Sequence, residues 1–406
     1  RFPEHKEVWM MNAAGPNGQV DLAPLVQLGE RMQRRTRDAE ELYRNNPLSV
    51  WLFGRALGED EICAAIHLAA SEQAVRCCVG SEAEDRASLA AFDAASEVVV
   101  DSTTIATILL LDHVDILESF EKQIVLSHGT FFALTAFARG ASKAEKPERV
   151  SIDRQRGPAF VTAPAEVKAR AVETATRLVS LASKRWRIVA CRELAELPQE
   201  QRKRLFEVFG EAAVESAAIA SALPRVLWSD DAVVGAMASQ QFGARRIWTQ
   251  SLFRRLLSSR AIDEEEYIRA SAGLVAARYH FTSATPEILR RAAQWAKWSP
   301  AQAPMPEVLG YLTSPFTKPA DAANLGAALI ALAYRDPALA LPEQHRTTVI
   351  AIAEAIGKRQ DGPRSVRLMR AVLERSFGLD VVGCADALRT LVVWSAESER
   401  RVRLLK

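Results

Sequence analysis

Short runs of apolar and β-branched residues alternate with longer amphipathic segments through the middle of the chain. Runs of this length are typical of buried strands, and apolar residues at every third or fourth position are typical of helices. The predicted strands lie at 75–79, 97–101, 124–126, 187–191, 225–228 and 247–248. Helical patterns separate them, for example at 82–95 and 232–241. This strand-helix alternation predicts a parallel sheet with right-handed crossovers.

Helical patterns also occupy both ends of the chain, so we expect a mostly helical molecule with an α/β centre. No strand pattern occurs after about residue 262. We therefore predict a helical N-terminal region at 1–73, an α/β domain at 74–262 and a helical C-terminal domain at 263–406. Near 140–165 the chain is rich in charged residues, proline and glycine, which predicts an exposed excursion from the α/β domain.

Composition narrows the class of protein without assigning a function. The 406 residues are 49% hydrophobic and 25% charged with a net charge of +2, unlike a strongly basic nucleic-acid-binding domain. The five cysteines form no C-x-x-C pair, so neither a disulfide framework nor a zinc site is indicated, and a reduced, cytoplasmic location is expected. No uncharged apolar run is long enough for a membrane span, so no membrane association is expected.

The clearest chemical signal is a set of acidic residues placed directly after two predicted strands. Asp101 ends the run at 97–101, and Asp230 and Asp231 follow the run at 225–228. Because the carboxyl ends of parallel strands share one edge of a sheet, where α/β proteins collect ligands, these carboxylates are expected to converge. Converging carboxylates are suitable ligands for a hard cation such as Mg²⁺. A structural interpretation stays open, because an Asp here can also cap the next helix.

Three short motifs follow one another along the chain and indicate a family. They are Val-Val-Val-Asp-Ser-Thr-Thr at 98–104, the acid-led segment Glu-Ser-Ala-Ala-Ile-Ala at 215–220, and Leu-Trp-Ser-Asp-Asp at 227–231. Together they resemble a PIN domain, the small α/β fold of many metal-dependent nucleases. The resemblance covers roughly 96–260, with an interruption at 140–185. The segment 242–250 is similar to a tail of some bacterial PIN-like proteins.

The resemblance implies a nuclease, most often a ribonuclease, that holds Mg²⁺ or Mn²⁺ on a cluster of carboxylates. The metal would polarise a phosphodiester and lower the pKa of an attacking water. By position, Asp101 is the first implied ligand, Glu215 the acid carried on a helix, and Asp230 or Asp231 the last. The resemblance also implies the effector of a larger bacterial defence or toxin-type protein.

The implied substrate is RNA or another single-stranded nucleic acid, whose phosphates require cationic contacts. The candidates for these contacts are His128, Arg245 and Arg246, together with Arg139. The helical flanks are candidate surfaces for a protein partner.

One position departs from the family pattern. The acid that PIN domains usually carry on the helix after the 124–126 strand falls on Ala133 in this chain. Glu211 or Asp112 would have to substitute for it. The rival hypothesis is therefore a non-catalytic, degenerate PIN-like scaffold that joins two helical modules and mediates protein or nucleic-acid interactions.

Overall fold

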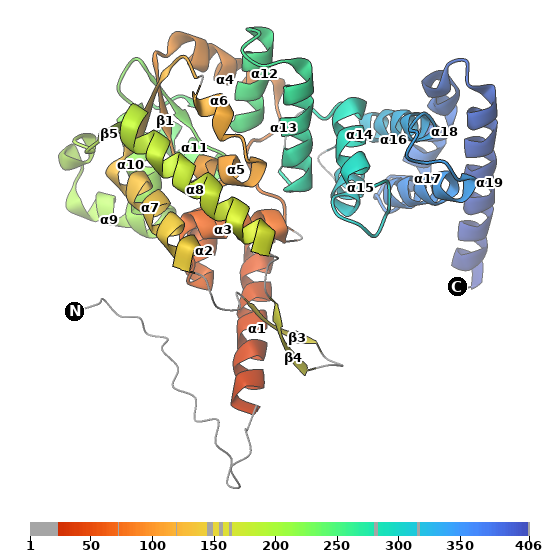
Figure 1. Ribbon diagram of the computed structural model, residues 1–406, viewed down its shortest axis with the longest axis horizontal. Helices are drawn as coiled ribbons and strands as arrows, with labels where there is room; N and C mark the ends of the chain where they lie inside the picture. The colour runs from red at the N-terminus through yellow and green to blue at the C-terminus, as the bar shows by residue number, and fades with distance from the viewer. Residues whose placement is uncertain are drawn as a thin grey trace.

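The computed structural model describes residues 23–71, 73–118, 120–143, 149–153, 157–161, 165–279, 283–314 and 317–404. A five-stranded parallel sheet with the order β5-β2-β1-β6-β7 lies within one end of the molecule (Figure 1). Its strands are β1 (Glu97–Val100), β2 (Gln123–Ser127), β5 (Arg187–Val189), β6 (Arg225–Trp228) and β7 (Arg246–Ile247). Every neighbouring pair is parallel, which confirms the predicted α/β centre.

The predicted strand at 75–79 is wrong. Val75 makes only an isolated bridge to Tyr279, and the rest of the segment joins no sheet. Its backbone carbonyls have other partners, because the Arg76 oxygen accepts from Ala232 N at 2.8 Å and the Cys77 oxygen accepts from Arg246 Nη1 at 2.9 Å. The segment is therefore a connection in which Val75 and Cys77 are buried and Val79 is exposed, and it does not extend the sheet.

The strands have buried residues on both faces, as their unbroken apolar runs predict. Val98 and Val100 of β1 belong to the main hydrophobic cluster, whereas Val99 belongs to a second cluster on the other face. All three residues are 0% exposed. This alternation fixes the register in which β1 pairs with β2 and β6.

Helices cover both faces of the sheet. The second cluster is formed with η1 (Glu193–Glu196), α9 (Gln199–Phe209), α10 (Glu211–Ala220) and α11 (Ala232–Phe242). The main cluster includes residues of α4 (Glu82–Ala94), α5 (Ser102–Leu111), α6 (Val114–Glu118), α7 (His128–Lys143), α8 (Ala165–Arg185) and α12 (Thr249–Ser258). The sheet is therefore the middle layer of three.

The excursion predicted at 140–165 is not a structureless loop. Helix α7 continues to Lys143, and β3 (Arg149–Asp153) and β4 (Gly157–Val161) then form an antiparallel hairpin. The hairpin lies beside α1 (Figure 1). The backbone N–H and C=O groups of β3 and β4 pair with one another, although the charged, proline-containing composition of this segment did not predict strands. Residues 144–148, 154–156 and 162–164, also within the predicted excursion, lie outside the described residues.

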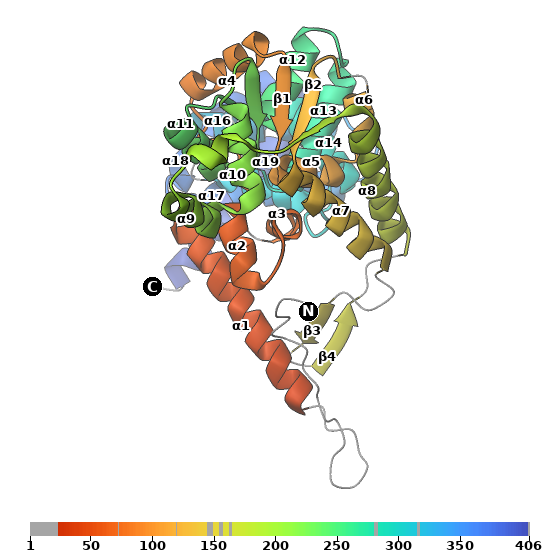
Figure 2. The same cartoon turned by 90° about the vertical axis from the view of Figure 1, so that its left-hand side faces the viewer.

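Three N-terminal helices precede the sheet: α1 (Ala23–Asn45), α2 (Val50–Leu57) and α3 (Glu61–Ala70). Ser49 caps α2 by accepting from Leu52 N, and Asp60 caps α3 by accepting from Cys63 N. Gly58 closes α2 at φ +79°, a left-handed conformation that glycine adopts without strain. The resulting α2–α3 pair lies at the end of the sheet from which α5 and α7 begin (Figure 2).

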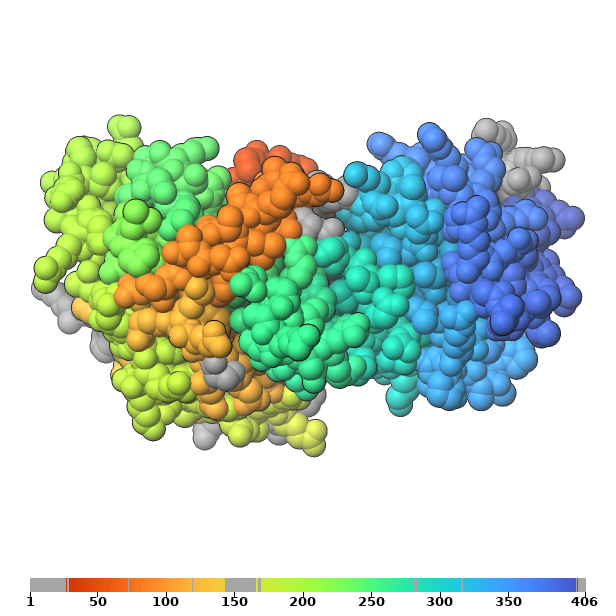
Figure 3. All heavy atoms as spheres, turned by 90° about the horizontal axis from the view of Figure 1, so that it is seen from above, coloured from red at the N-terminus to blue at the C-terminus, as the bar shows by residue number. Residues whose placement is uncertain are grey.

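The C-terminal part is helical, as predicted. It contains α13 (Glu264–Ala276), α14 (Pro286–Trp295), α15 (Met305–Thr313), α16 (Pro319–Tyr334), α17 (Pro342–Gly357), α18 (Gly362–Phe377) and α19 (Val381–Leu404). Prolines occupy the first turn of α14 through α18, where a missing N–H has no intrahelical partner to lose. These helices extend from α13 as a second lobe (Figure 3). None of the helices that the structure describes is long and apolar enough to cross a membrane.

Candidate functional site

The structure brings Asp101 and Asp230 together at the carboxyl edge of the sheet. Val100 at the end of β1 pairs with Trp228 at the end of β6, so the residues after both strands lie side by side. Asp101 N donates to Trp228 O at 3.3 Å, and Asp230 N donates to Thr103 Oγ1 at 3.0 Å. The convergence predicted from the two strand ends is therefore present in the backbone itself.

Asp101 is buried and uses only one of its carboxylate oxygens. Oδ1 accepts from Thr104 N at 2.9 Å and from Thr103 Oγ1 at 2.8 Å, which caps α5. Oδ2 has no hydrogen-bond partner, although the residue is 0% exposed. Burial raises the pKa of this carboxyl to about 6 against hydrogen bonds from Ser229, Thr104 and Thr103, and the nearby charge of Asp230 adds to the shift.

Asp230 is buried within a ring of hydroxyl groups. Oδ2 accepts from Thr107 Oγ1 at 2.6 Å and from Thr249 Oγ1 at 2.5 Å, while Oδ1 accepts from Thr249 N at 2.8 Å. Thr107 Oγ1 also lies 2.8 Å from the hydroxyl of Tyr279. Burial still raises the pKa of Asp230, because these donors and Arg246 compensate only part of the lost hydration.

Asp231 holds two helices at once. Oδ1 accepts from Val233 N at 2.8 Å and from Val234 N at 3.2 Å at the start of α11. Oδ2 accepts from Val50 N at 2.7 Å at the start of α2. Burial raises the pKa of Asp231 against these three backbone donors. The capping interpretation thus describes Asp231 well, and it adds a tertiary contact that the sequence does not indicate.

Glu215 lies farther along the same edge, on α10. Its Oε2 accepts from Gly129 N at 2.9 Å, at the start of α7. A Cβ added at Gly129 would come within 2.8 Å of this oxygen, so glycine allows the close approach. The neighbouring Ser216 and Thr130 hydroxyls lie 3.1 Å apart and reinforce the contact between α10 and α7. Glu215 therefore stabilises the helix after β2, while Asp101 and Asp230 lie after β1 and β6.

The predicted phosphate-binding residues differ in how they are held. His128 is exposed at the start of α7, and Arg245 is half-buried just before β7. Arg246 donates to Cys77 O, Asp231 O and Glu84 Oε1, and its guanidinium lies over the ring of Trp248. The Arg246 side chain is only 10% exposed, and its contacts connect the segments that contain Cys77, Asp231 and Glu84, so its role is structural.

The residues proposed to substitute for the missing acid lie elsewhere. Ala133 is half-buried on α7 and packs against the main cluster. Asp112 lies at the far end of α5 from Asp101, a distance of roughly 15 Å for a ten-residue helix. Its carboxylate accepts from Arg170 and Thr174, and although burial opposes the shift, these bonds lower its pKa. Glu211 is exposed at the start of α10.

The structure places a further acid, Glu61, beside the cluster. Glu61 is the first residue of α3, is 4% exposed, and leaves Oε1 without a hydrogen-bond partner. Burial raises its pKa well above the usual range, and the charges of Asp101 and Asp231 add to the shift. An acid in the first turn of a helix is normally solvated and interacts favourably with the helix dipole. No signal in the sequence separates Glu61 from such residues.

A divalent cation is compatible with these donors. Asp101 Oδ2 and Glu61 Oε1 are buried carboxylate oxygens without hydrogen-bond partners, and a hard cation takes oxygen ligands of this kind. In the part of the chain that the structure describes, no three His, Cys, Asp or Glu side chains are arranged to hold a metal by themselves. Mg²⁺ does not need such a cage, because it usually binds one or two carboxylates together with water and substrate phosphate.

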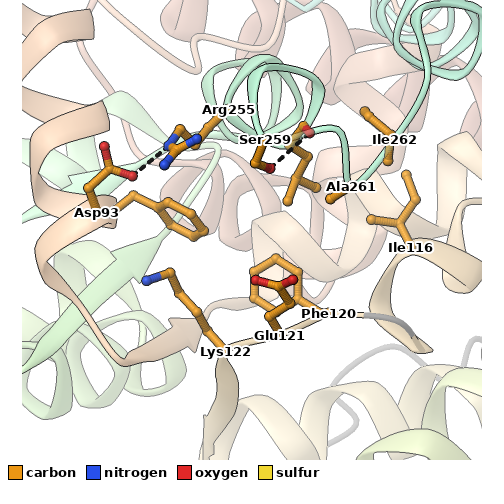
Figure 4. A pocket seen from close by; sticks show the side chains of 11 residues that line it. Asp93, Ile116, Phe120, Glu121, Lys122, Arg255, Ser259, Ala261 and Ile262 are labelled. Atoms are coloured by element: carbon orange, nitrogen blue, oxygen red, sulfur yellow. Dashed lines mark hydrogen bonds and ion pairs between the residues drawn. The ribbon is translucent and has the colours of Figure 1, made fainter.

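A separate pocket of about 220 Å³ lies at the opposite, amino-terminal edge of the sheet (Figure 4). Phe92, Phe120, Lys122 and Arg255 line it between α4, α12 and the start of β2. Its cationic side chains already have partners: Arg255 Nε donates to Asp93 Oδ1 at 2.5 Å, and Lys122 donates to the backbone oxygen of Ala95. We therefore place the candidate chemistry at the carboxylate edge.

Comparison with known proteins supports a PIN-like domain in the α/β part of the chain. Residues 99–240 match the family model described as the PIN domain associated with the TPR-GreAB-C-PIN system. The matched segment begins within β1 and ends within α11, so it contains Asp101, Glu215, Asp230 and Asp231 and leaves out Glu61. Comparisons with curated proteins and with solved structures give no match.

Proposed function

We propose that the PIN-like domain, which this chain carries within helical regions, is a nuclease that depends on Mg²⁺ or Mn²⁺ and cleaves phosphodiester bonds, with RNA as substrate. The supporting observation is Asp101 Oδ2, a buried carboxylate oxygen without a partner at the junction of the two central strands. An ionised carboxylate in such a place is unfavourable unless a cation is bound to it. A divalent cation would remove this penalty and reverse the direction of the pKa shift.

The residues have separable roles in this proposal. Asp101 would hold the metal, which when bound supplies charge neutralisation at the phosphate and activation of water. Asp230 adds negative charge beside Asp101, and Thr107 and Thr249 fix its orientation. Asp231 keeps the α11 and α2 helix ends in place at the same edge. His128, Arg139 and Arg245 are the proposed phosphate contacts, because these predicted candidates are not committed to core hydrogen bonds in the described residues, whereas Arg246 is.

Access to the site requires movement of the N-terminal helices. Asp101 and Asp231 are 0% and 2% exposed, and the start of α2 is bonded to Asp231. RNA phosphate cannot reach Asp101 until the α2–α3 pair is displaced. We therefore propose that the chain works as a controlled effector in the cytoplasm. The C-terminal helices would receive a protein partner, since Leu379, Val381 and Val382 are 99%, 74% and 82% exposed.

A non-catalytic scaffold is the second candidate, and Asp230 and Asp231 favour it. All four of their carboxylate oxygens accept hydrogen bonds that hold helices or loops in place. A degenerate PIN-like core could retain both residues for stability alone. Ala133, at the position where the family pattern has an acid, would then reflect the loss of catalysis. The two candidates differ in whether Asp101 binds a metal.

The test is cleavage of single-stranded RNA with Mn²⁺ by chains that carry Val50→Pro, which removes the N–H of α2 that is bonded to Asp231, with Asp101 either retained or replaced by Asn. Asparagine retains an oxygen that can accept from Thr104 N, so α5 keeps its cap while the charge is lost. Asp93→Asn in the same background is the control, because Asp93 pairs with Arg255 at the opposite edge of the sheet. The nuclease proposal expects activity in the control and none in Asp101→Asn. Equal activity in all three proteins, or no activity in the Val50→Pro chain that retains Asp101, supports the scaffold instead.

A further inference from the structure

We propose that Glu61 of α3 supplies the carboxylate that the family pattern places on α7 and that this chain lacks at Ala133. The inference rests on the proposed function, because it assigns a further metal-binding residue to the same site. Glu61 lies outside the segment 99–240 that matches the family model, so the site would be completed by the N-terminal helical region.

The packing of α3 places Glu61 in a suitable position. Helix α3 packs against both α5, which begins directly after Asp101, and α7, which carries Ala133. Asp60 caps α3 through Cys63 N, and the Ser102 side chain at the start of α5 hydrogen-bonds to Glu61 in the first turn of α3. Helices α2 and α3 approach each other closely, since a Cβ added at Gly54 would come within 2.7 Å of Ala64 Cβ. Glu61 is therefore held in place by backbone packing.

The surroundings of Glu61 indicate a cation ligand. Ser102, the first residue of α5, hydrogen-bonds through its side chain to Glu61, and this places Glu61 next to Asp101, the residue that caps α5. Glu61 Oε1 and Asp101 Oδ2 are buried carboxylate oxygens without hydrogen-bond partners. Asp101 and Asp231 are among the charges that raise the pKa of Glu61. Buried like charges repel one another unless a proton or a metal ion is shared between them.

A purely structural role does not explain this burial. An acid at the start of a helix stabilises the helix dipole while it remains hydrated, as exposed Glu82 can do at the start of α4. Helix α3 already has its capping acid in exposed Asp60. Glu61 instead gives up hydration and leaves an oxygen unpaired, which is unfavourable in the absence of a ligand.

The experiment is Mn²⁺ titration calorimetry on the full chain, combined with thermal unfolding in EDTA and in Mn²⁺. Glu61→Gln is isosteric and removes only the charge and one acceptor, and Glu82→Gln is the matched control at the first residue of another helix. The inference expects Glu61→Gln and Asp101→Asn each to weaken Mn²⁺ binding by about tenfold or more. In EDTA both variants should unfold at or above the wild-type temperature, because a buried repulsive charge has been removed. Glu82→Gln should bind Mn²⁺ like the wild type.

The outcomes separate this inference from the proposed function. Wild-type binding that Asp101→Asn loses and Glu61→Gln retains overturns the role of Glu61 and leaves the nuclease proposal standing. Absence of Mn²⁺ binding in the wild type overturns both. If Glu61→Gln unfolds below the wild type in EDTA, Ala133→Glu in that background decides the question. Recovery of Mn²⁺ binding supports the equivalence of the two positions, and continued loss contradicts it.

Discussion

Val50 N donates to Asp231 Oδ2 at 2.7 Å, so the first residue of α2 is bonded to the carboxylate that also caps α11. The contact joins residues 181 positions apart and closes the carboxylate edge of the sheet. A helix N-terminus leaves several N–H groups without intrahelical partners, and a carboxylate is the acceptor that suits them best. Asp231 thus couples the position of the α2–α3 pair to the core.

Replacing Val50 with proline should open this contact selectively. Proline is favoured at the first position of a helix, and Ser49 before it is already extended at φ −69° and ψ 155°, so the backbone accepts the ring. The change removes the N–H and leaves Asp231 Oδ2 unpaired, which should destabilise the fold by about 1–3 kcal/mol. Val50→Ala is the control, since it removes the side chain and keeps the N–H. Urea unfolding measures the difference.

The same pair of variants tests whether α2–α3 covers the site. Val50→Pro should cleave RNA faster than Val50→Ala when Mn²⁺ is present, because the α2–α3 pair is held less tightly over Asp101. Equal stability and equal activity in the two variants would show that the bond to Asp231 contributes nothing measurable.

The metal-free protein should lose stability as the pH rises. Burial raises the pKa of Asp101 from 3.8 to about 6, so the folded state binds its proton more tightly than the unfolded state. With respect to this group, stability is therefore full below about pH 4, falls between about pH 4 and pH 6, and is lower by about 3 kcal/mol above that range. Glu61 contributes in the same direction.

Urea unfolding in EDTA at pH 5 and pH 8 measures this effect. Asp101→Asn should flatten the dependence, because the amide does not titrate, and saturating Mn²⁺ should remove it. A metal-free wild type that is more stable at pH 8 than at pH 5, with the slope unchanged in Asp101→Asn, contradicts the assignment.

Thr249 should be sensitive to loss of its hydroxyl group. Its Oγ1 donates to Asp230 Oδ2 at 2.5 Å and accepts from Trp228 Nε1 at 2.9 Å, and all three residues are buried. Thr249→Val keeps the shape, leaves Trp228 Nε1 without its acceptor and removes one of the two hydroxyl donors to Asp230 Oδ2, which should destabilise the fold by about 1–3 kcal/mol. Thr249→Ser keeps the hydroxyl and should lose less. Chemical unfolding followed by tryptophan fluorescence compares them, and a loss in Thr249→Ser as large as that in Thr249→Val would contradict the importance of the hydroxyl group.

The strand-helix junctions of the site were predictable from the sequence, whereas its lid was not. Asp101 and Asp230 each follow a short β-branched or apolar run, and parallel strands bring such ends to one edge. Glu61 and Val50 come to the same edge through tertiary packing of α2 and α3 on the core. No local sequence pattern predicts such tertiary contacts. The predicted strand at 75–79 failed for a related reason, because its carbonyls bind Ala232 and Arg246.

Arg245 and Arg246 are adjacent in sequence and should respond differently to replacement by alanine. Arg246 donates to Cys77 O, Asp231 O and Glu84, so its loss leaves buried acceptors unpaired and should destabilise the fold by about 2–4 kcal/mol. Arg245 is half-buried and has no such core contacts among the described residues. Arg245→Ala should therefore keep the stability of the wild type.

RNA binding separates the two arginines further. Arg245→Ala should weaken binding of single-stranded RNA and reduce the slope of log affinity against log salt by about 1, as expected for one lost phosphate contact. Fluorescence anisotropy over a salt series measures this, on Val50→Pro as the parent so that the edge is accessible. If the slope for Arg245→Ala is unchanged, Arg245 does not contact an RNA phosphate. Unfolding cannot explain such a result, because Arg245→Ala is expected to be as stable as its Val50→Pro parent.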